Sequence, residues 1–252
     1  MPLPLAILIG LLIPFLGTSF GALSVFLLNG RSSERLERLL CGFASGVMIA
    51  ALVWSLIIPA INMTESSGGI GWIPATIGLL LGVLFLCSID LLLPARGEGE
   101  GRRSLLFFSV TLHNLPEGMA VGVVYAALLS GAEGVSLASA IGLSIGIALQ
   151  NLPEGAVISV PMASAGASAS RSFSAGVLSG VIEPLGAALM LFLSAYLSPL
   201  LPYLLSFAAG AMLEVVVREL IPASQTEGDG VLGVLGVSFG FSLMMILDVV
   251  FG

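Results

Sequence analysis

Residues 136–163 read SLASAIGLSIGIALQNLPEGAVISVPMA, a long apolar run in which Glu154 is the one charged side chain. About 18 to 20 apolar residues in a helix are enough to cross a bilayer. Similar runs recur along the whole chain, separated by short polar or glycine- and proline-containing breaks. A β-barrel would instead show shorter segments of alternating polarity. The run and its neighbours therefore predict an all-α integral membrane protein with several spans.

Composition agrees with this prediction. The chain is 57% hydrophobic and 9% charged, whereas soluble domains carry roughly 25% charged residues. That is too little charge to cover a water-facing surface of this size. The formal net charge of −7 argues against a nucleic-acid partner. We therefore expect membrane lipid, and no nucleic acid, around this protein.

The breaks between apolar runs predict eight membrane-spanning helices in a single transmembrane domain over residues 1–252. The spans are expected near 3–28, 39–61, 72–94, 105–130, 136–163, 174–197, 201–223 and 231–251. The first, third and fifth loops hold basic residues, and the second, fourth and sixth hold none. These basic residues are Arg31, Arg35, Arg38, Arg96, Arg102, Arg103 and Arg171. By the positive-inside rule the odd-numbered loops face the cytoplasm, which puts both termini outside.

A six-residue motif occurs twice, as HNLPEG at 113–118 and as QNLPEG at 150–155. On a helix, residues four apart share a face, and the next residue lies about 100° around. The first and fifth residues of each motif therefore share one helix face, and the asparagine lies beside them. These candidate ligands are His113, Asn114, Glu117, Gln150, Asn151 and Glu154.

The proline and glycine of each motif open the helix near these side chains. Pro116 and Pro153 cannot donate to the carbonyl four residues earlier, and a freed carbonyl in a membrane must find water, a side chain or an ion. Gly118 and Gly155 leave room for a neighbouring helix or a hydrated ion. This composition favours an ion site over a packing seam.

Three glutamates lie well inside spans with no basic residue near them in sequence: Glu117, Glu154 and Glu183. Carboxylates in such a place either protonate or hold a cation. Neutral, hydrogen-bonded acids that pack helices are the alternative. The fourth and fifth spans run antiparallel and bring the motifs to a similar depth, which is typical of a transporter site. Glu183, followed by Pro184 on the sixth span, would close the same site.

One imidazole, carboxylates and amides suit a divalent first-row ion such as Zn²⁺, Fe²⁺, Mn²⁺ or Co²⁺. The ligand count leaves room for two metals, with Glu117 and Glu154 as bridges. An H-E-x-x-H hydrolase needs two histidines, and His113 is the only one, so we expect no enzyme and no catalytic cofactor. A proton-coupled or other ion carrier that uses the same carboxylates is the second hypothesis.

Other charges in the spans are less informative. Glu214 and Arg218 are spaced i,i+4 and can pair, as a structural ion pair or within a transport route. Asp90, Glu219 and Asp248 lie near predicted span ends, where snorkelling or solvation is the simpler interpretation.

Together the motifs resemble the ZIP (Zrt-, Irt-like protein) family of divalent-metal transporters. HNLPEG and QNLPEG carry the likeness, with GVIEPLG at 180–186 and RELIP at 218–222. The resemblance covers essentially the whole chain, and Gln150, where many members have histidine, is similar to the GufA-like branch. The short loop between the third and fourth spans has no histidine, so a loop-borne metal sensor is not expected.

The resemblance implies a binuclear centre between the fourth, fifth and sixth spans, with two metal ions per protomer as substrate. One metal site would use His113, Glu117, Gln150 and Glu154. The second would use Asn114, Glu117, Asn151, Glu154 and Glu183. It further implies uptake into the cytoplasm across the cell membrane by an elevator-like or rocking motion, in a homodimer. Glu219 is a possible inner exit ligand, although Arg218 stands where relatives often have histidine or an acid.

Overall fold

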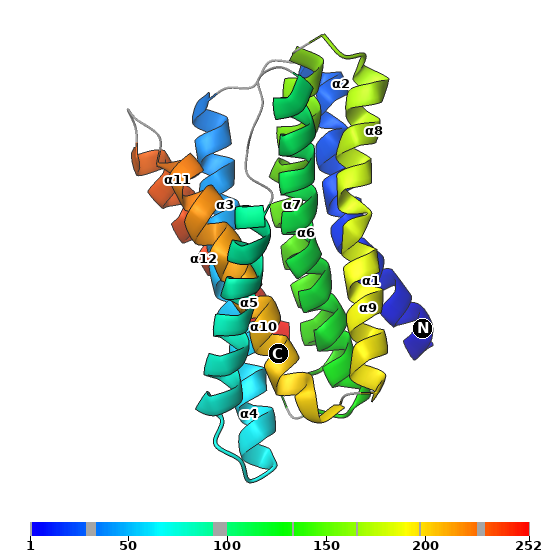
Figure 1. Cartoon of the computed structure of the whole chain (residues 1–252), viewed down its shortest axis with the longest axis vertical. Helices are drawn as coiled ribbons and strands as arrows, with labels where there is room; N and C mark the ends of the chain where they lie inside the picture. Colours follow the sequence, from blue (N-terminus) through cyan, green and yellow to red (C-terminus); the bar gives the residue numbers. More distant parts are fainter. Residues whose placement is uncertain are drawn as a thin grey trace.

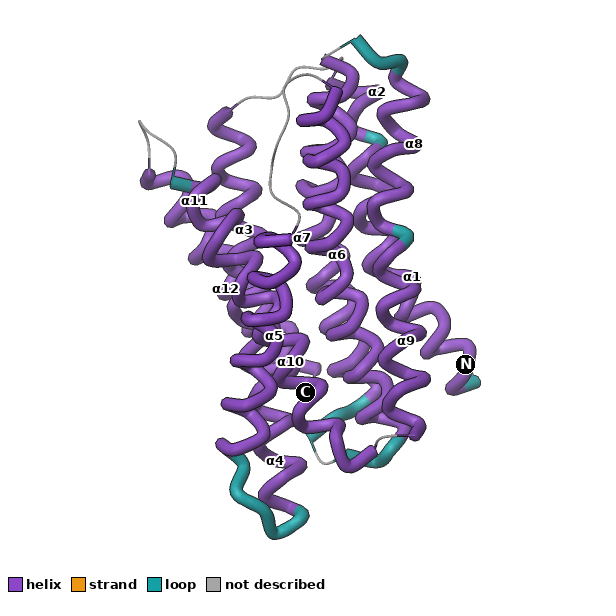
Figure 2. The backbone as a smooth tube through the Cα atoms, viewed as in Figure 1, coloured by secondary structure: helices purple, strands orange, loops and turns teal. Residues whose placement is uncertain are grey.

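The structure is a computed structural model, and it describes residues 2–28, 34–92, 100–132, 134–164, 166–196, 198–225 and 230–251. Within these ranges every regular element is helical (Figure 2). Six helical stretches there are long and apolar enough to cross a membrane. The predicted all-α membrane fold is therefore confirmed. The predicted number of spans stays a prediction, and Arg31 and Arg96 of the predicted loops lie outside the described residues.

One group of helices, which we call the motif bundle, carries both copies of the repeated motif (Figure 1). It consists of α1 (Leu3–Ala22), α2 (Ser24–Leu28), α6 (Glu100–Leu129), α7 (Leu137–Ser164), α8 (Ala169–Gly180) and α9 (Ile182–Tyr196). Within it α1 packs most extensively along α7, and α6 along α9. Segments far apart in the sequence are thereby brought around the two motifs.

The remaining helices form what we call the flanking bundle (Figure 1). It consists of α3 (Glu34–Ala51), η1 (Leu52–Ile57), α4 (Ile58–Ser66), α5 (Trp72–Leu92), η2 (Ser198–Leu200), α10 (Leu201–Val215), η3 (Val216–Leu220), α11 (Ile221–Ser224) and α12 (Gly230–Phe251). Here α3 packs along α12, and α5 along α10. The flanking bundle meets the motif bundle mainly where α10 lies against α6 and α3 against α7.

Two stretches expected to be regular helix, η1 and η3, are π-helical. The N–H of Ile58 donates to the carbonyl of Val53, five residues earlier, and that of Ile221 donates to Val216. A proline follows each isoleucine, as Pro59 does in the first case. Because proline has no N–H to continue the α ladder, the turn before it widens.

Glycines let helices within each bundle touch backbone to backbone. A β-carbon at Gly21 of α1 would collide with the carbonyl oxygen of Leu152 on α7. One at Gly46 of α3 would collide with the carbonyl of Val237 on α12. Such close approaches are typical of membrane helices, which associate through van der Waals packing.

Side chains, by contrast, fill the boundary between the two bundles. The buried core there includes Met48, Met212 and Met244, and Gly146 of α7 faces the sulfur of Met244. Methionine is unbranched and adapts to irregular surfaces. At Gly146 the contact between the bundles is thus made by a side chain rather than by backbone.

Large apolar side chains cover the outer faces of the helices. Phe239 is 66% exposed and Leu84 is 60% exposed. Patches of this kind are costly in water but suit lipid.

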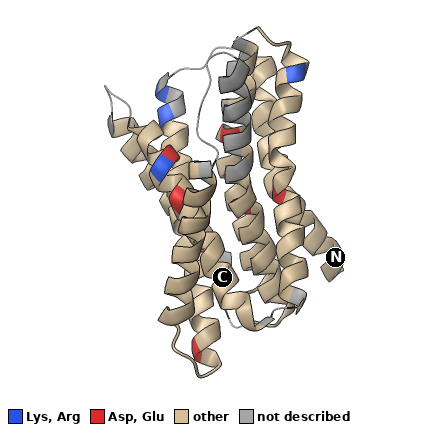
Figure 3. Ribbon diagram, viewed as in Figure 1, with Lys and Arg blue, Asp and Glu red and all other residues tan. Residues whose placement is uncertain are grey.

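Both termini lie in the lower half of Figure 1, whereas the basic residues drawn in Figure 3 lie in the upper half.

Candidate cation site

The candidate ligands whose side chains the structure describes all lie inside the motif bundle. Five of these side chains are at most 1% exposed, and that of Glu154 is partly buried. The five are Asn114 and Glu117 on α6, Gln150 and Asn151 on α7, and Glu183 in the first turn of α9. The acidic residues of this bundle, drawn in red in Figure 3, lie well away from both of its ends. The side chain of His113 falls outside the described residues, so its role as a ligand stays a prediction.

A hydrogen bond joins the two motifs. The side-chain amide of Gln150 donates from Nε2 to Oε1 of Glu117 at 2.6 Å. The difference between the motifs, histidine in one and glutamine in the other, thus places a neutral donor on a buried carboxylate. Because the nitrogen of Gln150 donates to Glu117, its side-chain oxygen is the atom left to bind a cation.

Glu183 is held from two other helices. Its Oε1 accepts from the Thr18 hydroxyl at 2.5 Å and from Nδ2 of Asn114 at 3.3 Å. The same Asn114 nitrogen lies 3.3 Å from the carbonyl oxygen of Ser179, next to the break between α8 and α9. The sequence offered no signal for Thr18, since a threonine in a membrane helix usually bonds to its own backbone.

The three glutamates form one electrostatic group. Glu154 repels both Glu117 and Glu183, and Glu183 repels Glu117. Among the described residues, side-chain amides and the Thr18 hydroxyl donate hydrogen bonds to Glu117 and Glu183. Ionised carboxylates crowded at low dielectric repel strongly, and a bound cation removes that repulsion.

Several buried oxygens of this cluster accept no hydrogen bond from any described residue. They are Oδ1 of Asn114, Oε2 of Glu117, Oε1 of Gln150, Oδ1 of Asn151 and Oε2 of Glu183. A buried acceptor without a partner costs roughly 1–3 kcal/mol. Carboxylate and amide oxygens are good ligands for divalent ions, so a cation would satisfy this set.

Acidic side chains alone do not complete a metal site here. In the described part of the chain, no three His, Cys, Asp or Glu groups lie together in metal-binding geometry. Glu117 and Glu183 instead turn one oxygen each to a neutral donor. The amide oxygens are therefore an essential part of the candidate ligand set.

The motif glycines serve as contacts between helices. A β-carbon at Gly118 would collide with the backbone of Glu183, and one at Gly155 would collide with the backbone of Thr18. Of the two uses expected for these glycines, the structure shows the close approach of a neighbouring helix. The first motif thereby brings Glu183 close to its own candidate ligands, and the second motif does the same for Thr18.

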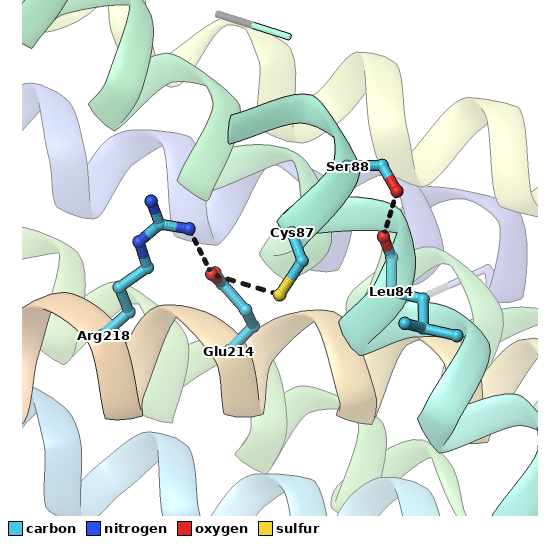
Figure 4. Close-up of polar contacts among 5 residues, drawn as sticks. All are labelled: Leu84, Cys87, Ser88, Glu214 and Arg218. Carbon is cyan, nitrogen blue, oxygen red and sulfur yellow. Dashed lines mark hydrogen bonds and ion pairs between the residues drawn. The ribbon is translucent and has the colours of Figure 1, made fainter. Parts of the chain in front are cut away.

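The predicted ion pair of the seventh span is confirmed and lies in the flanking bundle. Nη1 of Arg218 is 3.1 Å from Oε1 of Glu214, and Sγ of Cys87 on α5 is 3.9 Å from the same oxygen (Figure 4). The Glu214 side chain is 5% exposed and that of Arg218 is 51% exposed. This cluster links α10 to α5. Glu219 is partly buried in η3, and its role at an inner exit stays a prediction.

Asp248 differs from the expectation of simple solvation. Its Oδ1 accepts a hydrogen bond from Ser55 of η1 at 2.5 Å, and its side chain is partly buried. Burial against η1 explains the difference, because a carboxylate removed from water takes a donor from the protein.

Comparison with known proteins bears on the same residues. A family model described as ZIP Zinc transporter matches residues 98–248. The human protein named zinc transporter ZIP11 is 32% identical, over 93% of this chain and 94% of its own length. The chain belongs to the ZIP family.

Two bacterial relatives extend the likeness. The zinc transporter GufA of Myxococcus xanthus is 36% identical to this ZIP-family chain, over 93% of the chain and 94% of the relative. The zinc transporter ZIPB of Bordetella bronchiseptica is 33% identical, over 94% of the chain and 79% of the relative. The resemblance drawn from the motifs, including the GufA-like branch, is confirmed. The names of these relatives describe transporters rather than enzymes.

Proposed function

We propose that this ZIP-family protein transports divalent transition-metal cations into the cytoplasm, with Zn²⁺ as the first candidate and Fe²⁺, Mn²⁺, Co²⁺ and Cd²⁺ as further candidates. The observation that carries the proposal is the set of buried, unpartnered oxygens between α6, α7 and α9. The names of the relatives, all zinc transporters, support the choice of metal.

The hydrogen bonds of the cluster divide the candidate ligands into two groups, which supports two metal positions. Gln150 bonds to Glu117 on one side, and Asn114 bonds to Glu183 on the other. Glu154 interacts electrostatically with both glutamates. This arrangement supports a binuclear centre in which Glu154 and Glu117 bridge, with His113 as a nitrogen ligand of the first metal.

The two bundles support the proposed elevator-like or rocking motion. Glycine contacts join the helices that carry the ligands into one body, and adaptable side chains fill the boundary with the flanking bundle. A shift of the motif bundle would carry the whole ligand set with it. The driving force would be the metal gradient and the membrane potential, the latter worth about 2.3 kcal/mol per charge per 100 mV.

The direction rests on charge. The upper half of Figure 3 holds the described basic residues, and positive-inside bias would make this end cytoplasmic. Both termini would then lie outside the cell membrane. We further propose that the protein works as a homodimer, as the family resemblance implies.

Uptake into proteoliposomes tests the function. Purified protein should take up radiolabelled Zn²⁺ faster than empty vesicles, and Glu154→Ala and His113→Ala should each abolish or strongly reduce the rate while the protein still elutes as a folded species. Thr64→Val is a suitable control, because the Thr64 hydroxyl donates within its own helix α4, to the carbonyl of Ala60. Competition by the other metals ranks the candidates. No uptake of any metal would sink the proposal and favour a carrier of protons or other ions.

A further inference from the structure

We propose that Thr18 on α1 is a positioning residue of the cation site and helps to set its metal selectivity. Its hydroxyl holds one oxygen of Glu183, so that the carboxylate offers the cation its other oxygen. This inference rests on the proposed function. None of the motif residues belongs to α1, so Thr18 would bring a further helix into the site.

The hydrogen bond of Thr18 is unusual for a threonine in a membrane helix. Such hydroxyls commonly donate to the carbonyl four residues earlier, which here belongs to Pro14. The Thr18 hydroxyl instead donates to Oε1 of Glu183 at 2.5 Å, and Thr18 is fully buried. A short bond to a carboxylate oxygen is the strong, charge-assisted kind.

The surroundings hold Thr18 in this orientation. The backbone of Thr18 lies against Gly155 of the second motif, just as the backbone of Glu183 lies against Gly118 of the first. At Gly180 a β-carbon would lie 3.0 Å from Cβ of Thr18 and 3.2 Å from Oε1 of Glu183. Three glycines, two of which belong to the repeated motif, thus allow the helices that carry the hydroxyl and the carboxylate to approach closely.

The consequence is an asymmetric carboxylate. Oε1 of Glu183 has two donors, Thr18 at 2.5 Å and Asn114 at 3.3 Å, whereas Oε2 is buried and accepts from no described group. A carboxylate fixed in this way is a one-oxygen ligand. Smaller ions that take few ligands tolerate this, whereas larger ions more often use both oxygens of a carboxylate. Thr18 should therefore favour Zn²⁺ over the larger Cd²⁺.

Thr18→Val tests the inference, because valine keeps the shape and removes the hydroxyl. We expect the KM for Zn²⁺ uptake to rise about tenfold, as for loss of one hydrogen bond to a charged group, while kcat changes little. The ratio of Zn²⁺ to Cd²⁺ uptake should fall. Thr18→Ser should restore both values, and Thr64→Val, the same chemical change at a hydroxyl bonded within α4, should alter neither.

A binding measurement separates positioning from folding. The Zn²⁺ concentration that half-maximally raises the Tm in detergent should increase in Thr18→Val. In a Glu183→Ala background, Thr18→Val should cause no further change in Zn²⁺ binding, because the acceptor of the Thr18 hydrogen bond is already absent. If Thr18→Val fails to fold, Thr18→Ala replaces it in both assays.

The outcomes are distinct. Wild-type protein that neither binds nor transports metal overturns the proposed function itself. A functional wild type with unchanged KM and unchanged Zn²⁺ to Cd²⁺ ratio in Thr18→Val overturns the role of Thr18, even if its Tm falls. Additive effects of the two substitutions on Zn²⁺ binding would overturn it as well.

Discussion

Replacing Gln150 by leucine should weaken cation binding by a calculable amount. The Gln150 amide donates to Oε1 of Glu117 at 2.6 Å, and both residues are fully buried. A hydrogen bond to an ionised group contributes about 1.5–3 kcal/mol. At about 1.4 kcal/mol per tenfold, its loss should raise the apparent Kd for Zn²⁺ roughly 10- to 150-fold. Loss of the Gln150 oxygen as a ligand would add to this.

The assay is Zn²⁺-dependent thermal stabilisation in detergent, followed by initial rates of uptake in proteoliposomes. Gln225→Leu is the matched control, since Gln225 is exposed and lies beyond α11, and it should behave as wild type. Gln150→His keeps an N–H donor and adds a nitrogen ligand, so it should retain Zn²⁺ binding. A wild-type Kd in Gln150→Leu would refute the idea that this bond organises the site.

Three further predictions follow from the packing and the charges. Gly118→Ala should lower the stability by about 1–3 kcal/mol, seen as a lower Tm, because the new methyl meets the backbone of Glu183. Arg218→Ala should also lower the stability by about 1–3 kcal/mol, seen as a lower Tm, because the buried Glu214 carboxylate loses its charged partner; a matching loss of Zn²⁺ affinity would contradict its place outside the site. An inside-negative potential of 100 mV should speed Zn²⁺ uptake, since about 4.6 kcal/mol then favours entry of two charges; uptake insensitive to potential would refute electrogenic transport.

The pairing of Glu214 with Arg218 shows what sequence spacing can predict and what it cannot. Four residues apart on a helix, these groups were expected to be able to meet, and they do. Their spacing left open whether they line a transport route. The structure places them against Cys87 of α5, within the flanking bundle (Figure 4). Contact between α5 and α10 is a property of the fold and has no local signal.

The π-helical turns illustrate a different limit. The prolines that follow η1 and η3 were visible in the sequence, but proline in a span can kink, end or widen a helix. Which of these occurs depends on how neighbouring helices satisfy the freed backbone groups. Asp248 is a similar case, because its partner Ser55 comes from a helix nearly two hundred positions away in the chain.

The sequence by itself determined that this is a helical membrane protein of the ZIP family and which motif residues are candidate ligands. It could do so because hydrophobic length and i,i+4 spacing are local quantities. Only the tertiary structure decided that Gln150 donates to Glu117, that Gly118 and Gly155 lie against the backbones of Glu183 and Thr18, and that Thr18 donates to Glu183. These facts depend on which helix faces which, and that is settled by close packing between segments that the chain order keeps apart.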